Sequence, residues 1–344
     1  MYHVSSGWLL HDIPSAYRKE IEQIKLRGYD EEFIKLPGDF AWKESLSVDD
    51  IASDICPVRK DLYNSKARGL KGKEKNGRMT WGRRAGTVVE KYCTGLLGVF
   101  DDLYAGQPNV TYQTLIDKVH AYSKSFFASE NGIRRQMKEL EKIAAEEKSD
   151  SPQYLELVLQ YSARNELAFL AADWILGGLH TRRGAKLTER LPIVINRQRL
   201  EIHPDTAITG ISAPAIPDFL ITGTDSVGDV KSGKEFKHSH QMTCAGYALA
   251  RESELGPSGN TNIGIIYFIE THGFTPVPAR AYFFVISDVL RRAFIDRRDK
   301  AYSVLSRSAQ TRQRPDISTV DRERHCVHCK FLEVCDCDRN CSAD

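Results

Sequence analysis

The first half of the chain shows the spacing of apolar positions that is typical of helices. Ser47 and Asp50 have the form of a capping box, so a helix is expected to begin there and to carry Ile51, Ile55 and Leu62 on one side. The stretch 69–79 has three glycines and no apolar periodicity, which predicts a loop after that helix. Further helices are predicted over residues 81–104, 111–127, 132–147 and 152–177.

From residue 190 onward the pattern changes to short segments rich in β-branched and aromatic residues. These segments predict strands over residues 191–202, 216–222, 227–231, 263–269 and 281–286. Helices are predicted between and after them, over residues 238–254 and 287–305. Strands gathered in this way with helices around them indicate an α/β core, with a sheet covered on both faces and an added N-terminal helical region.

Length and composition narrow the class of protein. The 344 residues contain 41% hydrophobic and 27% charged residues, which is ordinary for a folded chain and excludes a disordered one. No apolar run approaches the length of a membrane span, and charged residues interrupt the first 30 positions where a secretory signal would lie. We therefore expect a cytoplasmic protein that does not enter a membrane.

Positive charge is concentrated in two stretches, although the whole chain is nearly neutral at +2. Residues 66–84 hold eight basic residues and one acidic residue, and residues 291–324 hold ten and five. Such stretches are typical of a surface that binds the phosphates of a nucleic acid. The alternative is a solvated loop and a solvated helix face.

The segment 215–234 contains the side chains best suited to catalysis. Asp229 and Lys231 share one face of a predicted strand, because side chains alternate along a strand. A hairpin would bring Asp218, at the end of the preceding strand, beside Asp229. Two carboxylates and a lysine suit a Mg²⁺ or Mn²⁺ site with an amine that orients or deprotonates a water. The alternative is a surface hairpin with exposed charges.

Eight cysteines occur in the chain, and five of them lie within its last 19 residues. A reducing compartment disfavours disulfides and favours metal ligation by thiolates. One arrangement is a local zinc site made of Cys326, Cys329 and two of Cys335, Cys337 and Cys341. Cys93 and Cys244 lie in apolar helical contexts and are interpreted as core residues.

Pro217-Asp218, followed after ten residues by Asp229-Val230-Lys231, resembles the PD-(D/E)xK nuclease signature. Upstream, the segment from Gly86 to Glu90 resembles the Gly-x-x-x-His element of the RecB-like branch, with an acidic residue in place of the histidine. The resemblance implies a restriction-endonuclease-like mixed sheet flanked by helices. It further implies a catalytic lysine and a metal site, formed by Lys231 and by Glu90, Asp218, Asp229 and the Val230 carbonyl.

The RecB-like family also places a glutamine and a tyrosine on the helix after the lysine strand. Here Tyr247 fits the tyrosine position, and Gln241 or Thr243 stands near the glutamine position. The segment Cys56-Pro57-x-Arg59 resembles the N-terminal cysteine element of RecB/AddB-type iron-sulfur nucleases. The resemblance implies a [4Fe-4S] cluster in a C-terminal clasp, bound by Cys56, Cys326, Cys329 and Cys335, as an alternative to zinc.

Taken together, these motifs resemble the CRISPR-associated exonucleases of the fourth Cas family, and within it the archaeal subtype I-A, Csa-type variant. The resemblance implies a Mg²⁺- or Mn²⁺-dependent deoxyribonuclease that trims single-stranded or frayed DNA ends during spacer acquisition, with the integrase complex as partner. Alternatives are a repair nuclease working with a helicase, and a non-catalytic iron-sulfur DNA-binding subunit. The expected domains are an N-terminal helical region (1–80), a nuclease core (81–310) with a helical insertion (105–180), and the clasp (311–344).

Overall fold

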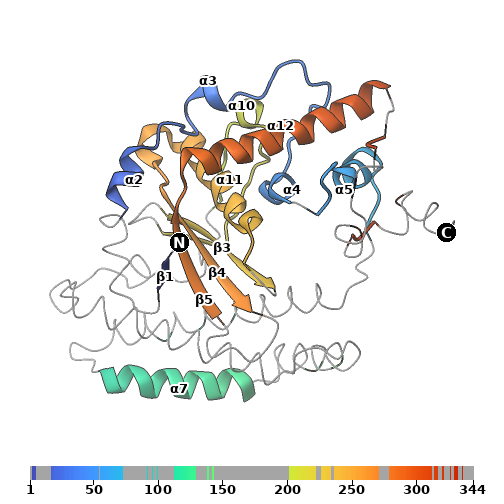
Figure 1. The fold of residues 1–344 in the computed structure, drawn as a ribbon. Helices are drawn as coiled ribbons and strands as arrows, with labels where there is room; N and C mark the ends of the chain where they lie inside the picture. The colour runs from blue at the N-terminus through green and yellow to red at the C-terminus, as the bar shows by residue number, and fades with distance from the viewer. Residues whose placement is uncertain are drawn as a thin grey trace.

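A computed structural model gives the fold of the chain (Figure 1). It describes residues 2–4, 17–53, 55–72, 112–128, 201–221, 226–233, 236–270, 279–311 and 314–316, with single residues or short pieces at 91, 95, 99, 138, 142, 320, 326, 329–331 and 335. Glu90 and the predicted element over 152–177 lie outside the described residues. The same holds for all but a few single residues of the elements predicted over 81–104 and 132–147, and for nearly all of the predicted strand 191–202.

A five-stranded mixed sheet forms the centre of the described structure. Its spatial order is β1-β5-β4-β3-β2. The strands are β1 (Tyr2–Val4), β2 (Phe219–Ile221), β3 (Ser226–Gly233), β4 (Ile263–Glu270) and β5 (Ala279–Val285). Strands β3 and β4 run parallel, and every other neighbouring pair is antiparallel. The predicted mixed α/β class is therefore confirmed, and the sheet contains four of the strands predicted in the second half of the chain, those over 216–222, 227–231, 263–269 and 281–286.

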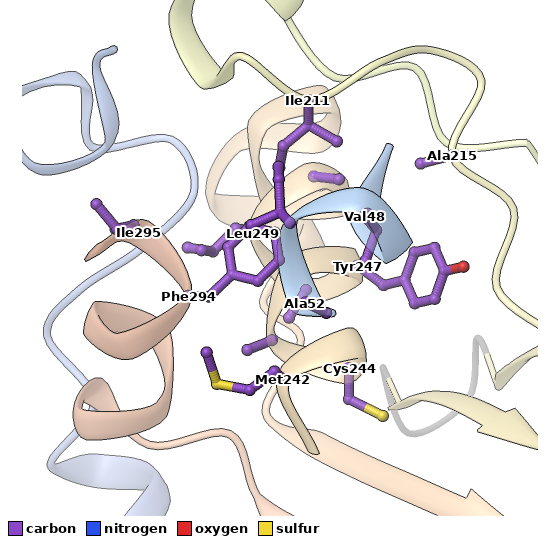
Figure 2. Close-up of a cluster of buried hydrophobic side chains, with 14 of the residues drawn as sticks. Val48, Ala52, Ile211, Ala215, Met242, Cys244, Tyr247, Leu249, Phe294 and Ile295 are labelled. Atoms are coloured by element: carbon purple, nitrogen blue, oxygen red, sulfur yellow. The ribbon is translucent and has the colours of Figure 1, made fainter. Parts of the chain in front are cut away.

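One face of the sheet is covered by α11 (His238–Leu255), and α12 (Asp288–Thr311) and α4 (Val48–Ala52) pack on α11 (Figure 1). Val227 on β3 and Ile266 on β4 belong to the buried core on this face. Figure 2 shows Val48, Met242, Leu249 and Phe294 meeting where the three helices come together. Asp229 and Lys231 alternate with Val230 and so point to the same side as Val227.

Gly246 allows the close approach of α4, α11 and α12. A Cβ atom at this position would lie 2.5 Å from Phe294 Cε2 and 2.7 Å from Val48 Cγ1. These separations are well below van der Waals contact, so any larger residue would push the helices apart.

The N-terminal part is a series of short helices rather than the long helix predicted from residue 47. The Ser47–Asp50 capping box is present, but α4 ends at Ala52, and Ser53 is extended. The chain becomes helical again only at α5 (Lys60–Leu62), which continues into η1 (Tyr63–Ala67). Pro57 lies in this break, and proline disfavours helical conformation in the residue before it. Ile55 is consequently exposed instead of lying on a buried face.

The other described helices are short apart from one. They are α2 (Arg18–Glu22), α3 (Glu31–Ile34), α7 (Tyr112–Ala128), α10 (Thr206–Thr209) and η4 (Gly256–Gly259). Helix α7 agrees with the helix predicted over residues 111–127. None of the described helices combines the length and apolar sequence that crossing a bilayer requires.

Several arginines of the second basic stretch are used inside the protein rather than on a phosphate-binding surface. Arg291 is fully buried and donates to both carboxylate oxygens of Glu252, at 2.6 and 3.0 Å. Arg298 donates to the Thr209 carbonyl at 2.8 Å, and Arg297 to the Ala52 carbonyl at 2.6 Å. The basic residues of α12 therefore include arginines that make internal hydrogen bonds and ion pairs as well as arginines on the surface. Neither interpretation of the sequence predicted these internal arginines.

Candidate functional site

A β-hairpin brings Asp218 to Asp229. Phe219, the first residue of β2, pairs with Gly228 in antiparallel register, so Asp218 lies opposite Asp229 just before the strand begins. The Asp218 carboxylate accepts a hydrogen bond of 2.7 Å from the backbone N–H of Val230. Asp218 thus precedes β2 rather than ending a strand. The hydrogen bond from Val230 fixes its carboxylate at the open end of the hairpin.

Lys231 forms an ion pair with Asp229 on the same face of β3. Burial, with the neighbouring Asp218 carboxylate, raises the pKa of Asp229 to about 8, although the Lys231 ammonium opposes the shift. Burial by itself would lower the pKa of Lys231, but the Asp229, Asp49 and Asp218 carboxylates together hold it above its ordinary value. Lys231 is therefore a protonated ammonium, suited to orienting a water or a phosphate oxygen rather than to removing a proton.

Asp49 is a further acidic residue at this site, and sequence reasoning assigned it no role there. It belongs to α4, and its Oδ1 lies 3.9 Å from Lys231 Nζ. The local sequence around Asp49 indicated only the start of a helix, through the capping box formed by Ser47 and Asp50. Nothing in local periodicity indicates that the Asp49 side chain of α4 would reach Lys231.

Tyr247 of α11 also lies near the carboxylates. Burial raises its pKa, and the negative charges of Asp229, Asp49 and Asp218 raise it further. Figure 2 shows its ring beside Val48, with the hydroxyl directed away from the hydrophobic cluster. Gln241, by contrast, makes a 3.1 Å contact with His238 Nδ1, and Thr243 is buried.

Two predicted ligands of this site remain, Glu90 and the Val230 carbonyl, and only Val230 belongs to the described residues. The position of Glu90 relative to Asp218 and Asp229 therefore stays a prediction. Val230 is placed beside both aspartates, and its N–H rather than its carbonyl makes the contact with Asp218. The structure therefore unites Asp218, Asp229 and Lys231 and adds Asp49.

The four cysteines predicted to bind a cluster come from the two ends of the chain. Cys56 follows α4, and the N–H of Cys329 donates to the carbonyl of Cys326 at 2.9 Å in a turn. Burial raises the pKa of the Cys329 thiol; a backbone N–H opposes this, whereas Cys335, Asp61 and Cys56 reinforce it. Cys335, Cys56 and Asp61 of α5 are therefore all near enough to Cys329 to act on its thiol electrostatically. Cys244 is a buried core residue, as predicted.

The side chains at the hairpin and at the cysteines can be compared with the ligands that metal ions require. Within the ranges that the structure describes, no group of three or more His, Cys, Asp or Glu side chains is arranged to hold a metal ion. The chemistry of the donors nevertheless fits a hard cation at the hairpin, because two carboxylates in contact, one of them buried, need a proton or a cation between them. At the cysteine site, thiols are the donor type that suits a soft metal centre.

Comparison with known proteins points to one family. The family model of the CRISPR-associated exonuclease Csa1 matches residues 180–338, which include Asp218, Asp229, Lys231 and the three C-terminal cysteines predicted to bind the cluster, Cys326, Cys329 and Cys335. A CRISPR-associated exonuclease Csa1 from Saccharolobus solfataricus is 29% identical over 136 residues, which is 40% of this chain and 42% of the relative. No solved structure matches. Over residues 180–338 the chain is therefore similar to the Csa1 family of CRISPR-associated exonucleases, which confirms the relationship that the motifs predicted.

Proposed function

We propose that the protein is a metal-dependent DNA exonuclease with its active site at the β2–β3 hairpin. The observation that carries this proposal is the meeting of Asp218, Asp229 and Lys231 at the β2–β3 hairpin. The similarity of residues 180–338 to a family named as exonucleases supports the same chemistry. Asp218 and Asp229, with Glu90 as a third ligand, would hold Mg²⁺ or Mn²⁺, and the Val230 carbonyl completes the proposed set.

The divalent cation would stabilise the negative charge that develops on the phosphate during hydrolysis. The chain's own residues supply the rest. The Lys231 ammonium is held at the site by carboxylates and can donate hydrogen bonds to the attacking water or to a phosphate oxygen. The Val230 N–H fixes the Asp218 carboxylate, so this ligand needs little reorganisation when the cation arrives.

Cleavage of end-labelled DNA with Mn²⁺ tests this assignment. We expect Asp229→Asn and Lys231→Ala to abolish cleavage while binding of the same DNA in the presence of Ca²⁺ persists. Asp296→Asn is the matched control, because Asp296 is an exposed carboxylate on α12. Cleavage by either site variant at the wild-type rate would refute the assignment.

We also propose a [4Fe-4S] cluster bound by Cys56, Cys326, Cys329 and Cys335. Support comes from the electrostatic influence of both Cys56 and Cys335 on the pKa of the Cys329 thiol, which relates a thiol near the N-terminus to two near the C-terminus. Thiolate ligands suit iron and sulfide. The cluster would then fasten the C-terminal segment to α5 and stabilise the fold, since metal binding free energy adds to folding free energy.

Anaerobic purification followed by visible absorption and metal analysis tests the cluster. We expect a broad iron-sulfur band and iron in the wild type, and loss of both in Cys335→Ser. Cys244→Ser is the matched control, because Cys244 is a buried thiol between α11 and β4, with its Sγ 3.7 Å from the Ile265 carbonyl. Stoichiometric zinc without iron in the wild type would refute the cluster.

The proposed substrate is a single-stranded or frayed DNA end that is trimmed during spacer acquisition, and the proposed partner is the integrase complex. Support comes from the similarity to a CRISPR-associated family. Lys66 and Lys71 are exposed and belong to the first basic stretch, which could follow a DNA backbone. Co-purification with integrase subunits supports this role, and co-purification with a helicase instead would favour a repair nuclease.

A further inference from the structure

The Lys231 ammonium lies between two carboxylates that differ greatly in exposure. It contacts Asp229, whose side chain is only 8% exposed, and lies 3.9 Å from Asp49, whose side chain is 73% exposed. The Lys231 side chain itself is 26% exposed. The ammonium therefore sits at the boundary between the buried site and solvent, with one acidic partner on each side.

A cation at the proposed nuclease site would compete with Lys231 for Asp229. The ammonium already contacts Asp229 Oδ2, and a divalent ion needs carboxylate oxygens as ligands. When the ion takes Asp229, the ammonium loses its closest counter-charge while it remains partly buried. Asp49 is the other carboxylate within ion-pair distance of Lys231 in the part of the chain that the structure describes.

The position of Asp49 is fixed by its neighbours rather than by its own contacts. Asp50, the next residue, makes the capping box with Ser47 and an ion pair of 2.8 Å with Lys66. The carbonyl end of α4 is held by Arg297, which donates to the Ala52 carbonyl at 2.6 Å. Helix α4 is thus anchored at both ends, and the Asp49 carboxylate is left to face Lys231.

We propose that Asp49 is a positioning residue of the nuclease site, which receives the Lys231 ammonium when a divalent cation occupies Asp229. The inference rests on the proposed function. Asp49 does not bind the cation; it lowers the cost of displacing the lysine, and it keeps the ammonium beside the ion, where a phosphate oxygen or a water would lie. Asp49 should therefore affect cation binding only through Lys231.

Calorimetric titration of Mn²⁺ into the full-length protein without DNA separates these roles. We expect Asp49→Asn to weaken Mn²⁺ binding about threefold, the effect of one partly exposed ion pair. In a Lys231→Met background Mn²⁺ should bind more tightly, because no ammonium competes, and adding Asp49→Asn should change nothing further. Asp49→Glu should restore wild-type affinity, and Asp296→Asn should leave it unchanged.

Two results would overturn the proposal. One is an equal loss of Mn²⁺ affinity from Asp49→Asn with and without Lys231, which would make Asp49 a direct source of negative charge for the ion. The other is no loss from Asp49→Asn in the chain that retains Lys231. Failure of the wild type to bind Mn²⁺ would overturn the nuclease assignment together with this one, and it is recognised in the wild-type titration alone.

Discussion

Asp229 and Lys231 lie two residues apart on one face of β3 and form the ion pair at the centre of the candidate site. The two groups differ in exposure: the Asp229 carboxylate is buried beside a second carboxylate, whereas the Lys231 ammonium reaches toward solvent. The proton on Asp229 and a divalent cation are therefore alternative ways of compensating the same buried charge.

Metal binding should release a proton from Asp229. Because burial raises the pKa of Asp229 to about 8, the metal-free carboxyl competes for a proton near neutral pH even though Lys231 favours its ionised form, so a cation must displace whatever proton is held there. Mn²⁺ affinity should rise as the pH increases between about 6 and 8 and level off above that range. Calorimetry at neutral pH in buffers of different ionisation enthalpy should show a net release of protons on Mn²⁺ binding. An affinity independent of pH would contradict the shifted pKa.

Glu252→Gln should destabilise the protein strongly. The Glu252 carboxylate is fully buried and accepts hydrogen bonds from Arg27, Arg291 and the N–H groups of Gly28 and Thr261. Replacing it leaves the buried Arg291 guanidinium without its counter-charge, which costs about 3–5 kcal/mol. Denaturant unfolding monitored by circular dichroism measures the loss, and Asp296→Asn serves as the exposed control. A stability equal to that of the control would exclude this role for the network.

Gly246→Ala should lower stability through crowding alone. The added methyl would collide with Phe294 and Val48, and overpacking of this kind costs about 1–3 kcal/mol. Gly38→Ala is the matched control, because a Cβ at Gly38 meets nothing within 4 Å. Thermal unfolding of the two variants should separate them, and equal melting temperatures would show that the three helices can move apart freely.

The parts of the fold that depend on local sequence could be predicted. β-branched and aromatic residues indicated β3 and β4, and strand alternation correctly placed Asp229 and Lys231 on one face. The capping box at Ser47 was likewise a local signal, and it is present. Each of these features is determined by neighbours within a few residues along the chain.

Features that depend on distant contacts could not be predicted from local patterns. Asp49 reaches Lys231 only because α4 packs against α11, which lies about half the chain away. Apolar periodicity also continued past Ala52, although Pro57 and its neighbours break the helix there. Charge counting could not distinguish the internal arginines of α12 from surface arginines, because the difference lies in partners such as Glu252.

Arg59 connects the cysteine site to α4. It lies three residues after Cys56, and its N–H donates to the Cys56 carbonyl at 3.0 Å. Its guanidinium is buried and donates to the carbonyls of Asp50, Ile51 and Ser53 at the end of α4. The same side chain thus orders the segment that carries Cys56 and the helix that carries Asp49.

Arg59→Lys should weaken both regions, because a lysine keeps the charge but cannot serve three carbonyls arranged for a planar guanidinium. Loss of charged hydrogen bonds to buried carbonyls should lower the free energy of unfolding by about 2–3 kcal/mol. The visible absorption of the proposed cluster should also be lost faster on exposure to air, since Cys56 is held less firmly. Arg307→Lys, an exposed position on α12, provides the control. Wild-type stability combined with wild-type cluster lifetime in Arg59→Lys would show that the two regions are anchored independently.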